Sequence, residues 1–476
     1  MSKRLLLVAL AVLPVLGLSG CSFIPEYFRP KVPVPESWPD ATPQRVGDGK
    51  TAVPAVAALA AEWRKVFLDP VLQVLITSAL EHNRDLRIAT ARVEEARALA
   101  GISRADRFPQ IDFATQRTAS LTPGDLTTTG RSLNSQRYDA SLGITAFELD
   151  FWGRVASLDA AARAGFLASD YAQRAFRYSL IADVASAYFT LIELQQRLAL
   201  AETTEKSRAE SRRLIVARRD VGLAGDLDVH TADGAYQTAR ADYASLGRQR
   251  AAAENALRLL VGDVTVAFKQ PTAEKPVTLD SSWIADVAVG LPAEVLLLRP
   301  DVMAAEQKLV AANANIGAAR AAFLPKIVLT ATAGSASKAL TGLFKAGSGA
   351  WAFNPVLRYP LFDAGRSSDN VDLAIARKDI AVAEYEKTVQ QAFRETADLL
   401  TAREKLAEQL QALDANVTAQ GDRLRIVTAR HEAGVSSYLE LLDAQREHFA
   451  AQQSVLAVKR LQLSTTASLY KALGQL

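Results

Sequence analysis

The stretch LIADVASAYFTLIELQQRL, residues 180–198, sets the plan of the chain, because its apolar residues alternate at spacings of four and three. This spacing is typical of the a/d seam of a coiled coil. The seam residues are Leu180, Val184, Ala187, Leu191, Leu194 and Leu198. The surrounding run from Trp152 to Arg219 contains no proline and is long enough for a helix of roughly 100 Å. The spacing resumes after the break at Gly222-Leu-Ala-Gly225, which predicts a long helical hairpin over residues 152–262.

The helical hairpin recurs in the second half of the chain at a constant offset. Ala217-Arg218 and Gly222 reappear as Ala429-Arg430 and Gly434. A second seam accompanies them, at Leu399, Leu406, Leu410, Leu413 and Val417. Independent positions must agree on one offset, so an internal duplication is a stronger signal than local propensity. We therefore predict two repeats, at residues 67–262 and 291–476, joined by an irregular linker at 263–290, in which residues 281–289 form a short helix.

Each repeat is predicted to begin with shorter helices and to continue into two strands. In the first half, Asp69-Pro70 and Asn83 are helix start signals. Segments of alternating polarity then flank a polar loop at 120–136, and the second half repeats the pattern around a loop at 334–349. We expect β-hairpins at about 109–148 and 325–361, and a second helical hairpin at 366–474. Pro355 is unusual for a strand, because proline removes a backbone donor.

Four strands are too few to close a barrel, since the smallest closed barrels need about eight. From the alternation alone, two readings stay open: surface hairpins packed on the helices, or a share of a transmembrane β-barrel. The helices are long, the strands are short and amphipathic, and the amino terminus predicts secretion and a lipid anchor. Together these features favour a wall segment of an oligomeric tube.

The amino terminus supports secretion and lipid anchoring. Lys3 and Arg4 precede an apolar run that is too short to span a bilayer, and small residues stand before Cys21. The stretch LSGC, residues 18–21, resembles a bacterial lipobox, in which the cysteine becomes the acylated first residue. The alternative is an incidental cysteine after an ordinary signal.

We therefore predict a signal peptide at residues 1–20 and acyl chains, palmitate among them, on Cys21, which would anchor the mature chain stably. Residues 21–66 are expected to form an extended, lipid-anchored segment, because the part between Phe23 and Gln44 is rich in proline.

Composition and motifs exclude several classes of function. The formal net charge of +3 argues against a nucleic acid partner. The chain has no Gly-rich phosphate loop, no His-Glu-x-x-His zinc motif and no Gly-x-Ser-x-Gly nucleophile elbow, so we predict neither an enzyme nor a cofactor. With one cysteine and two methionines, a metal site is not predicted either. The histidines are scattered and are expected to be solvated: His82, His230, His431 and His448.

Four dispersed motifs closely resemble those of the TolC-like outer membrane factors, in the lipoprotein branch of the OprM, MtrE and NodT type. They are LPAEVLLLRPDV at 291–302, NANIGAARAAFLPKI at 313–327, ELDFWGR at 148–154 and GVSSYLELLD at 434–443. The resemblance covers nearly the whole mature chain. It implies a mainly α fold with a small β part, in which three chains build a twelve-stranded outer membrane β-barrel continued by a periplasmic α-helical tunnel.

The acids beside the helical turns are the candidate functional residues. Asp226 and Asp228 in the first half correspond to Tyr438 and Glu440 in the second, and Asp443 follows one turn later. An acid at a helix start caps free N–H groups, which is the alternative to a functional role. The resemblance implies that Glu440 and Asp443 line the periplasmic entrance. The gate candidates are therefore these two acids, the first-half acids, Tyr438, and the nearby Arg423 and Arg430, which could pair with the acids. The turns themselves are candidates for docking an adaptor: Gly222, Gly225, Gly434, Val435 and Ser436.

The resemblance implies a passive exit duct in the bacterial outer membrane for drugs or other small toxic compounds. Its partners would be two further copies of the chain, outer membrane lipids, a periplasmic membrane-fusion adaptor and an inner membrane transporter of the RND type. The alternatives are a duct for metal ions, a duct for type I protein secretion, and a lipid-anchored coiled-coil spacer without a pore.

Overall fold

The computed structural model describes residues 22–31, 63–265, 278–285 and 293–473. The predicted signal peptide, Cys21 and most of the predicted linker lie outside these residues. The described chain divides into two compact units. The first contains residues from 1–31, 92–170 and 304–386, and the second contains residues from 32–91, 171–303 and 387–476.

The helices confirm the internal duplication, because corresponding helices have equal lengths. The longest, α6 (Arg154–Asp220) and α9 (Arg366–Glu432), have 67 residues each. Each is followed by a helix of 36 residues, α7 (Asp226–Val261) or α10 (Tyr438–Leu473). The helices before the strands, α5 (Arg84–Ala105) and α8 (Pro300–Ala321), have 22 residues each. The fold is mainly α with a small β part, as predicted. Among the described residues, none of the helices is both long and apolar enough to span a lipid bilayer.

The predicted helix starts are confirmed by their capping contacts. Asp69 caps α4 (Pro70–His82) by accepting a hydrogen bond from the Val71 N–H at 2.9 Å. Asn83 caps α5 through its Oδ1 atom, which accepts from the Leu86 N–H at 2.8 Å. The Asn83 amide also donates to the Leu260 carbonyl at 2.8 Å, and this contact ties the start of α5 to the end of α7.

The apolar core of the second unit lies where α4, α6, α7 and α10 meet. Its fully buried side chains include Phe67, Leu72, Ile76, Phe189 and Leu257. All six predicted seam residues of α6 between 180 and 198 are buried or partly buried, which confirms the heptad pattern. At about 25 cal/mol per Å² of apolar surface, this packing stabilises the long helices more than their propensity does.

The predicted helix at 281–289 is wrong within the described residues. The chain makes a single 3₁₀ turn, Ser281–Trp283, and then Ile284 forms an antiparallel bridge with Phe67. The Trp283 ring stacks on Phe189 with a centroid separation of 6.4 Å. A partner from far away in the sequence therefore holds this segment extended.

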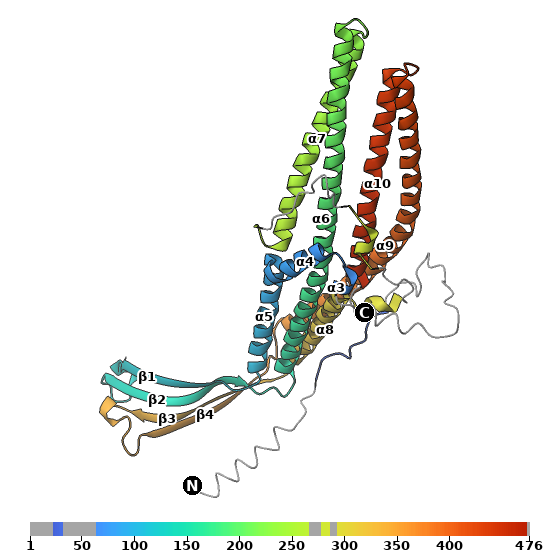
Figure 1. Ribbon diagram of the computed structural model, residues 1–476. Coiled ribbons are helices and arrows are strands. Elements are labelled where there is room, and N and C mark those ends of the chain that lie inside the picture. Colours follow the sequence, from blue (N-terminus) through green and yellow to red (C-terminus); the bar gives the residue numbers. More distant parts are fainter. Residues whose placement is uncertain (1–21, 32–62, 266–277, 286–292, 474–476) are drawn as a thin grey trace. The chain divides into compact units, whose positions relative to one another are not determined.

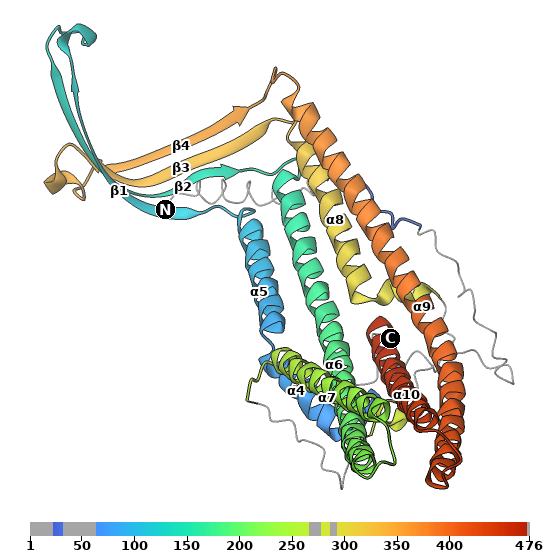
Figure 2. The same ribbon diagram turned by 90° about the horizontal axis from the view of Figure 1, so that it is seen from above.

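The first unit carries one antiparallel sheet in the order β1-β2-β3-β4, and Figures 1 and 2 show the four strands side by side. The strands are β1 (Ile111–Thr122), β2 (Leu133–Glu148), β3 (Lys326–Ser337) and β4 (Gly349–Arg358). The loops predicted at 120–136 and 334–349 are therefore too long. Cross-strand pairing extends the ladder into polar residues, as at Ser120 and Ser135, whose hydroxyl oxygens lie 2.9 Å apart.

The register places large apolar residues from all four strands on one face. One rung consists of Phe113, Leu142, Ala333 and Trp351, and the rung two residues away consists of Ile111, Ile144, Ala331 and Phe353. Directly paired residues point to the same side of a sheet. A bulge between Ile144 and Phe147 restores Phe147 to the same face, opposite Leu329. Pro355 lies inside β4, which is an edge strand of this sheet.

Residues 22–31 form neither helix nor strand, and they dock on α8 rather than lead away freely. The Asn313 amide donates to the Pro25 carbonyl at 2.8 Å. Ile24 lies against Gly317, where an added Cβ would approach the Ile24 side chain to 2.6 Å. Arg29 donates twice to the buried Glu306 carboxylate, at 2.8 and 2.6 Å. We refer to residues 22–31 as the N-terminal strap.

Candidate functional site: the helical turns and their acids

The two helical turns end their long helices in the same way. Gly222 and Gly434 have φ of 75° and 74°, in the left-handed region that favours glycine. The Gly222 N–H donates to the Arg219 carbonyl and the Leu223 N–H to the Arg218 carbonyl, both at 2.8 Å. The second turn repeats the pair, since Gly434 donates to His431 and Val435 to Arg430. These are Schellman motifs, in which glycine is the usual residue at the left-handed position.

The turns expose apolar side chains at equivalent positions. Leu223 and Leu227 of the first turn are 78% and 79% exposed, and Val435 and Leu439 of the second are 68% and 69% exposed. Ser436, which the sequence suggests as a docking residue, is instead buried. The exposed apolar surface of the turns therefore comes from side chains beside the glycines.

The first-turn acids differ in their contacts. Asp228 accepts a hydrogen bond from the Gly225 N–H at 3.1 Å, as a residue that caps α7 does. Asp226 stands in the first turn of the same helix and is exposed. Asp228 therefore has the contact expected of a helix-capping acid, which is the alternative to a gate role that the sequence left open.

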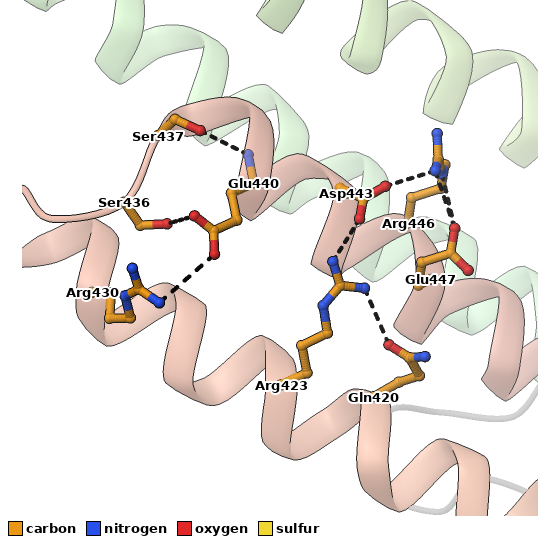
Figure 3. Close-up of polar contacts among 9 residues, drawn as sticks. All are labelled: Gln420, Arg423, Arg430, Ser436, Ser437, Glu440, Asp443, Arg446 and Glu447. Carbon is orange, nitrogen blue, oxygen red and sulfur yellow. Dashed lines mark hydrogen bonds and ion pairs between the residues drawn. The ribbon is translucent and has the colours of Figure 1, made fainter.

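The second-turn acids form ion pairs that link α9 to α10 (Figure 3). Asp443 binds Arg423 of α9 at 2.6 Å and Arg446 of its own helix at 2.7 Å. Glu440 lies 4.0 Å from Arg430 of α9, and it accepts a short hydrogen bond from the Ser436 hydroxyl. The structure thus brings together Arg423 with Asp443 and Arg430 with Glu440, the partners that the sequence suggested.

The electrostatics of Asp443 reflect these contacts. The hydrogen bond from Arg423 lowers the pKa of the Asp443 carboxyl below its ordinary value, and the nearby Arg446 charge acts in the same direction. At neutral pH the α9–α10 link is therefore an ion pair. Exposed pairs of this kind are usually worth less than about 1 kcal/mol, so several must act together to hold a helix position.

Tyr438 connects the second turn to the first helical hairpin. Burial raises the pKa of its phenol, while the neighbouring Arg208 and a hydrogen bond with Ser211, both on α6, oppose that shift. Its ring lies 6.0 Å from the ring of His431, whose Nδ1 atom is 3.0 Å from the Ser436 carbonyl oxygen. His431 is therefore part of the turn rather than a solvated side chain.

Sequence reasoning missed three contributors to this cluster. Arg446 follows Asp443 by three residues, a spacing at which helical side chains meet, so the sequence did contain that signal. Ser436 precedes its partner Glu440 by four residues, so that contact is local too. Arg208 carried no such signal, because Gln445 becomes its neighbour only when the two helical hairpins pack together. Among the described residues, no three His, Cys, Asp or Glu side chains lie close enough together to hold a metal ion.

Comparisons with known proteins agree with this architecture over nearly the whole chain. The family model of outer membrane efflux proteins matches residues 75–263 and 291–475. The toluene efflux pump outer membrane protein TtgF of Pseudomonas putida is 44% identical over 479 residues, which cover 100% of this chain and 97% of that relative. Outer membrane protein OprJ of Pseudomonas aeruginosa is 41% identical, and the match covers 98% of this chain and 95% of that protein.

Solved structures show the same fold. The open-state MtrE outer membrane channel of Neisseria gonorrhoeae matches with a TM-score of 0.81 and 35% identity, over 95% of this chain and 98% of that channel. The protein is thus an exit duct of the outer membrane with a helical periplasmic part, from a family of channels rather than of enzymes. The chain belongs to the outer membrane efflux protein family.

Proposed function

We propose that three copies of this chain form the exit duct of a tripartite pump that expels small apolar toxic compounds. Relatives named for toluene efflux and for antibiotic efflux support this cargo class. The observation that carries the proposal is the open sheet: within the described part of the chain, β1 pairs only with β2, and β4 pairs only with β3. Three such sheets, joined edge to edge, would leave no free edge and would place one apolar face toward lipid.

The pump partners in this proposal are a periplasmic adaptor of the membrane-fusion class and an inner membrane transporter of the RND type. The adaptor would dock on the exposed apolar side chains beside Gly222, Gly225 and Gly434, including Leu223 and Val435. Acyl chains on Cys21 would add a second attachment to outer membrane lipids. The duct performs no covalent chemistry and requires no cofactor.

Planar bilayer recordings and strain susceptibility test the duct. Purified protein should show stepwise channels, and a deletion strain should become sensitive to toluene and to apolar antibiotics. Restoration of the wild-type gene should reverse both sensitivities. Purified trimers that never produce stepwise conductance would contradict the duct and favour a spacer without a pore. Sensitivity limited to metal ions, or loss of a secreted protein, would instead assign another cargo.

We further propose that the Asp443 and Glu440 clusters form the periplasmic gate. Their ion pairs join α9 to α10, so movement of one helix against the other requires these contacts to break together. A threefold axis would bring three copies of each acid close to one another, and such a ring attracts cations. The resting channel is then expected to conduct poorly, to prefer cations and to be blocked by divalent ions from the periplasmic side.

The double substitution Glu440→Gln with Asp443→Asn tests this gate, because it removes the charges and nearly preserves side-chain shape. We expect higher resting conductance, weaker cation preference and weaker divalent block in single-channel recordings. A matched control is Glu408→Gln with Asp414→Asn, which removes the same charge from exposed positions on α9. Recordings of the double variant that match wild type in selectivity and block would assign these acids to helix capping alone.

A further inference from the structure

A cavity of about 340 Å³ lies between the first helical hairpin and α10. Its apolar lining includes Leu439, Leu442 and Phe449 of α10. Three threonines of α6 and α7 also line it: Thr204, Thr231 and Thr238. Each threonine hydroxyl donates to a carbonyl of its own helix, at 2.8 to 2.9 Å. Those hydroxyl oxygens can still accept a hydrogen bond, but their protons are already used.

Arg208 of α6 is the unusual member of this lining. Its side chain is only 8% exposed, and its hydrogen bond goes to the neutral amide oxygen of Gln445 on α10. Among the described residues, Arg208 has no ion pair. Burial lowers the pKa of its guanidinium. A guanidinium has five N–H donors, so the bond to Gln445 leaves most of its donor capacity available.

Another buried arginine shows how this protein satisfies a guanidinium elsewhere. Arg299 is 6% exposed and lies 2.8 Å from both Asp301 and Glu395. A buried charge without a counter-ion is costly, because desolvation is not offset by attraction. Arg208 lacks such an acidic partner among the described residues. An anion from outside this part of the chain would therefore offset the cost of its burial.

The other charged groups around the cavity determine which anion fits. Asp443 and Arg446 pair with each other and neutralise that part of the wall. Asp242 is exposed, so it lies at the solvent side of the lining. A second acid group near Asp242 would be repelled, which favours a ligand with one negative charge, directed toward Arg208.

We propose that this cavity binds a small amphiphilic organic anion, whose carboxylate or sulfonate lies on Arg208 and whose apolar body packs against Leu442 and Phe449. The cavity volume falls within the range of small-molecule sites, and apolar walls with few polar groups are usual there. A bound molecule would contact both helical hairpins of one chain, and it would thereby stabilise the folded protein by mass action. The proposal does not depend on channel activity, because binding is measured on the purified protein.

The test uses 1-naphthoate as the anion and 1-naphthalenemethanol as the neutral analogue, in calorimetric titrations of the full-length protein in detergent. Titration of empty micelles provides the background. We expect one saturable naphthoate site per chain, much weaker binding of the alcohol, and a rise in Tm with naphthoate. Because bidentate charge-assisted bonds are the strongest class, Arg208→Gln should weaken naphthoate binding by roughly tenfold or more.

Two further variants separate loss of the site from loss of the fold. Ala235→Leu fills the cavity from α7 and keeps Arg208, so it should also abolish binding. Arg240→Gln removes an exposed guanidinium of α7 that does not line the cavity, and it should leave affinity unchanged. If Arg208→Gln fails to fold, the binding measured for Ala235→Leu tests whether naphthoate occupies this cavity. Absence of a saturable site, or equal naphthoate affinity in wild type and in the cavity variants, would overturn the proposal.

Discussion

At the residue scale, Glu306 shows how one buried carboxylate can hold a segment that lacks secondary structure. Glu306 is 8% exposed, and it accepts hydrogen bonds from Arg29 and from the Tyr27 hydroxyl, the latter at 3.2 Å. Its burial together with a charged partner makes this contact stronger than a surface ion pair. The N-terminal strap is thus attached to α8 by specific contacts, and the lipid predicted on Cys21 is one residue before it.

We predict that Glu306→Gln loosens the strap without unfolding the protein. The neutral amide keeps the size of the side chain but loses the charge-assisted bonds to Arg29. Backbone amides of residues 22–31 should exchange with deuterium about tenfold faster, and exchange in α8 should change little. Glu94→Gln is the matched control, because Glu94 is an exposed partner of Arg97. Identical exchange of the strap in wild type and Glu306→Gln would mean that Ile24 and Pro25 hold it alone.

The Asp443 pair predicts a pH dependence of the proposed gate. The pKa of Asp443 is lowered from an ordinary value of 3.8, so the pair stabilises the closed arrangement fully above pH 3.8. That stabilisation is lost as the pH falls through the lower folded-state pKa. Conductance in bilayers should therefore rise below pH 3.8 in wild type, and the Asp443→Asn channel should lack this step. The same acid-induced rise in both channels would assign it to another group.

At the element scale, the register of the sheet places residues from all four strands on the apolar face. Leu142 lies in the rung with Phe113, Ala333 and Trp351, whereas Ser141 lies in the adjacent rung with Ala114 and Gly334. Neighbouring residues on a strand point to opposite faces. If the apolar face meets lipid, an arginine there costs about 2–4 kcal/mol at the bilayer midplane.

Leu142→Arg should therefore reduce the amount of trimer in outer membrane fractions, whereas Ser141→Arg should reduce it much less. The two substitutions place the same side chain on opposite faces of one strand. Heat-modifiable migration in gels and quantification of the membrane fraction measure the difference. Equal losses in the two variants would show that the apolar face does not meet lipid.

At the scale of the whole molecule, two separate attachments to the outer membrane are expected, the acyl chains and the barrel. The barrel would hold the protein in the bilayer independently. We predict that Cys21→Ala, exported with an ordinary signal peptide, leaves a folded trimer largely in the outer membrane. Fractionation and native gels measure this outcome. Disappearance of the trimer from the membrane fraction would show that the strands insert poorly without the lipid.

The sequence by itself determined the elements that have a local period. Heptad spacing predicted the long helices, alternation predicted the strands, and the constant offset between Gly222 and Gly434 predicted the duplication. The first two signals depend on how a helix or strand repeats along its own axis, and the third on comparing two halves of one sequence, so no spatial partner is needed to read any of them. The pairing of Asp443 with Arg423 followed from the same hairpin, because a short turn brings residues of its two arms together.

The tertiary structure alone decided the features that depend on distant partners. Polar residues around Ser120 and Ser135 extend the strands because each supplies the other's ladder contacts. The helix predicted at 281–289 stops after the 3₁₀ turn Ser281–Trp283 because Phe67 bridges Ile284. The strap docks because Gly317 leaves room for Ile24 and Glu306 accepts from Arg29. In each case the free energy comes from a contact between residues remote in sequence, and no local pattern encodes such a contact.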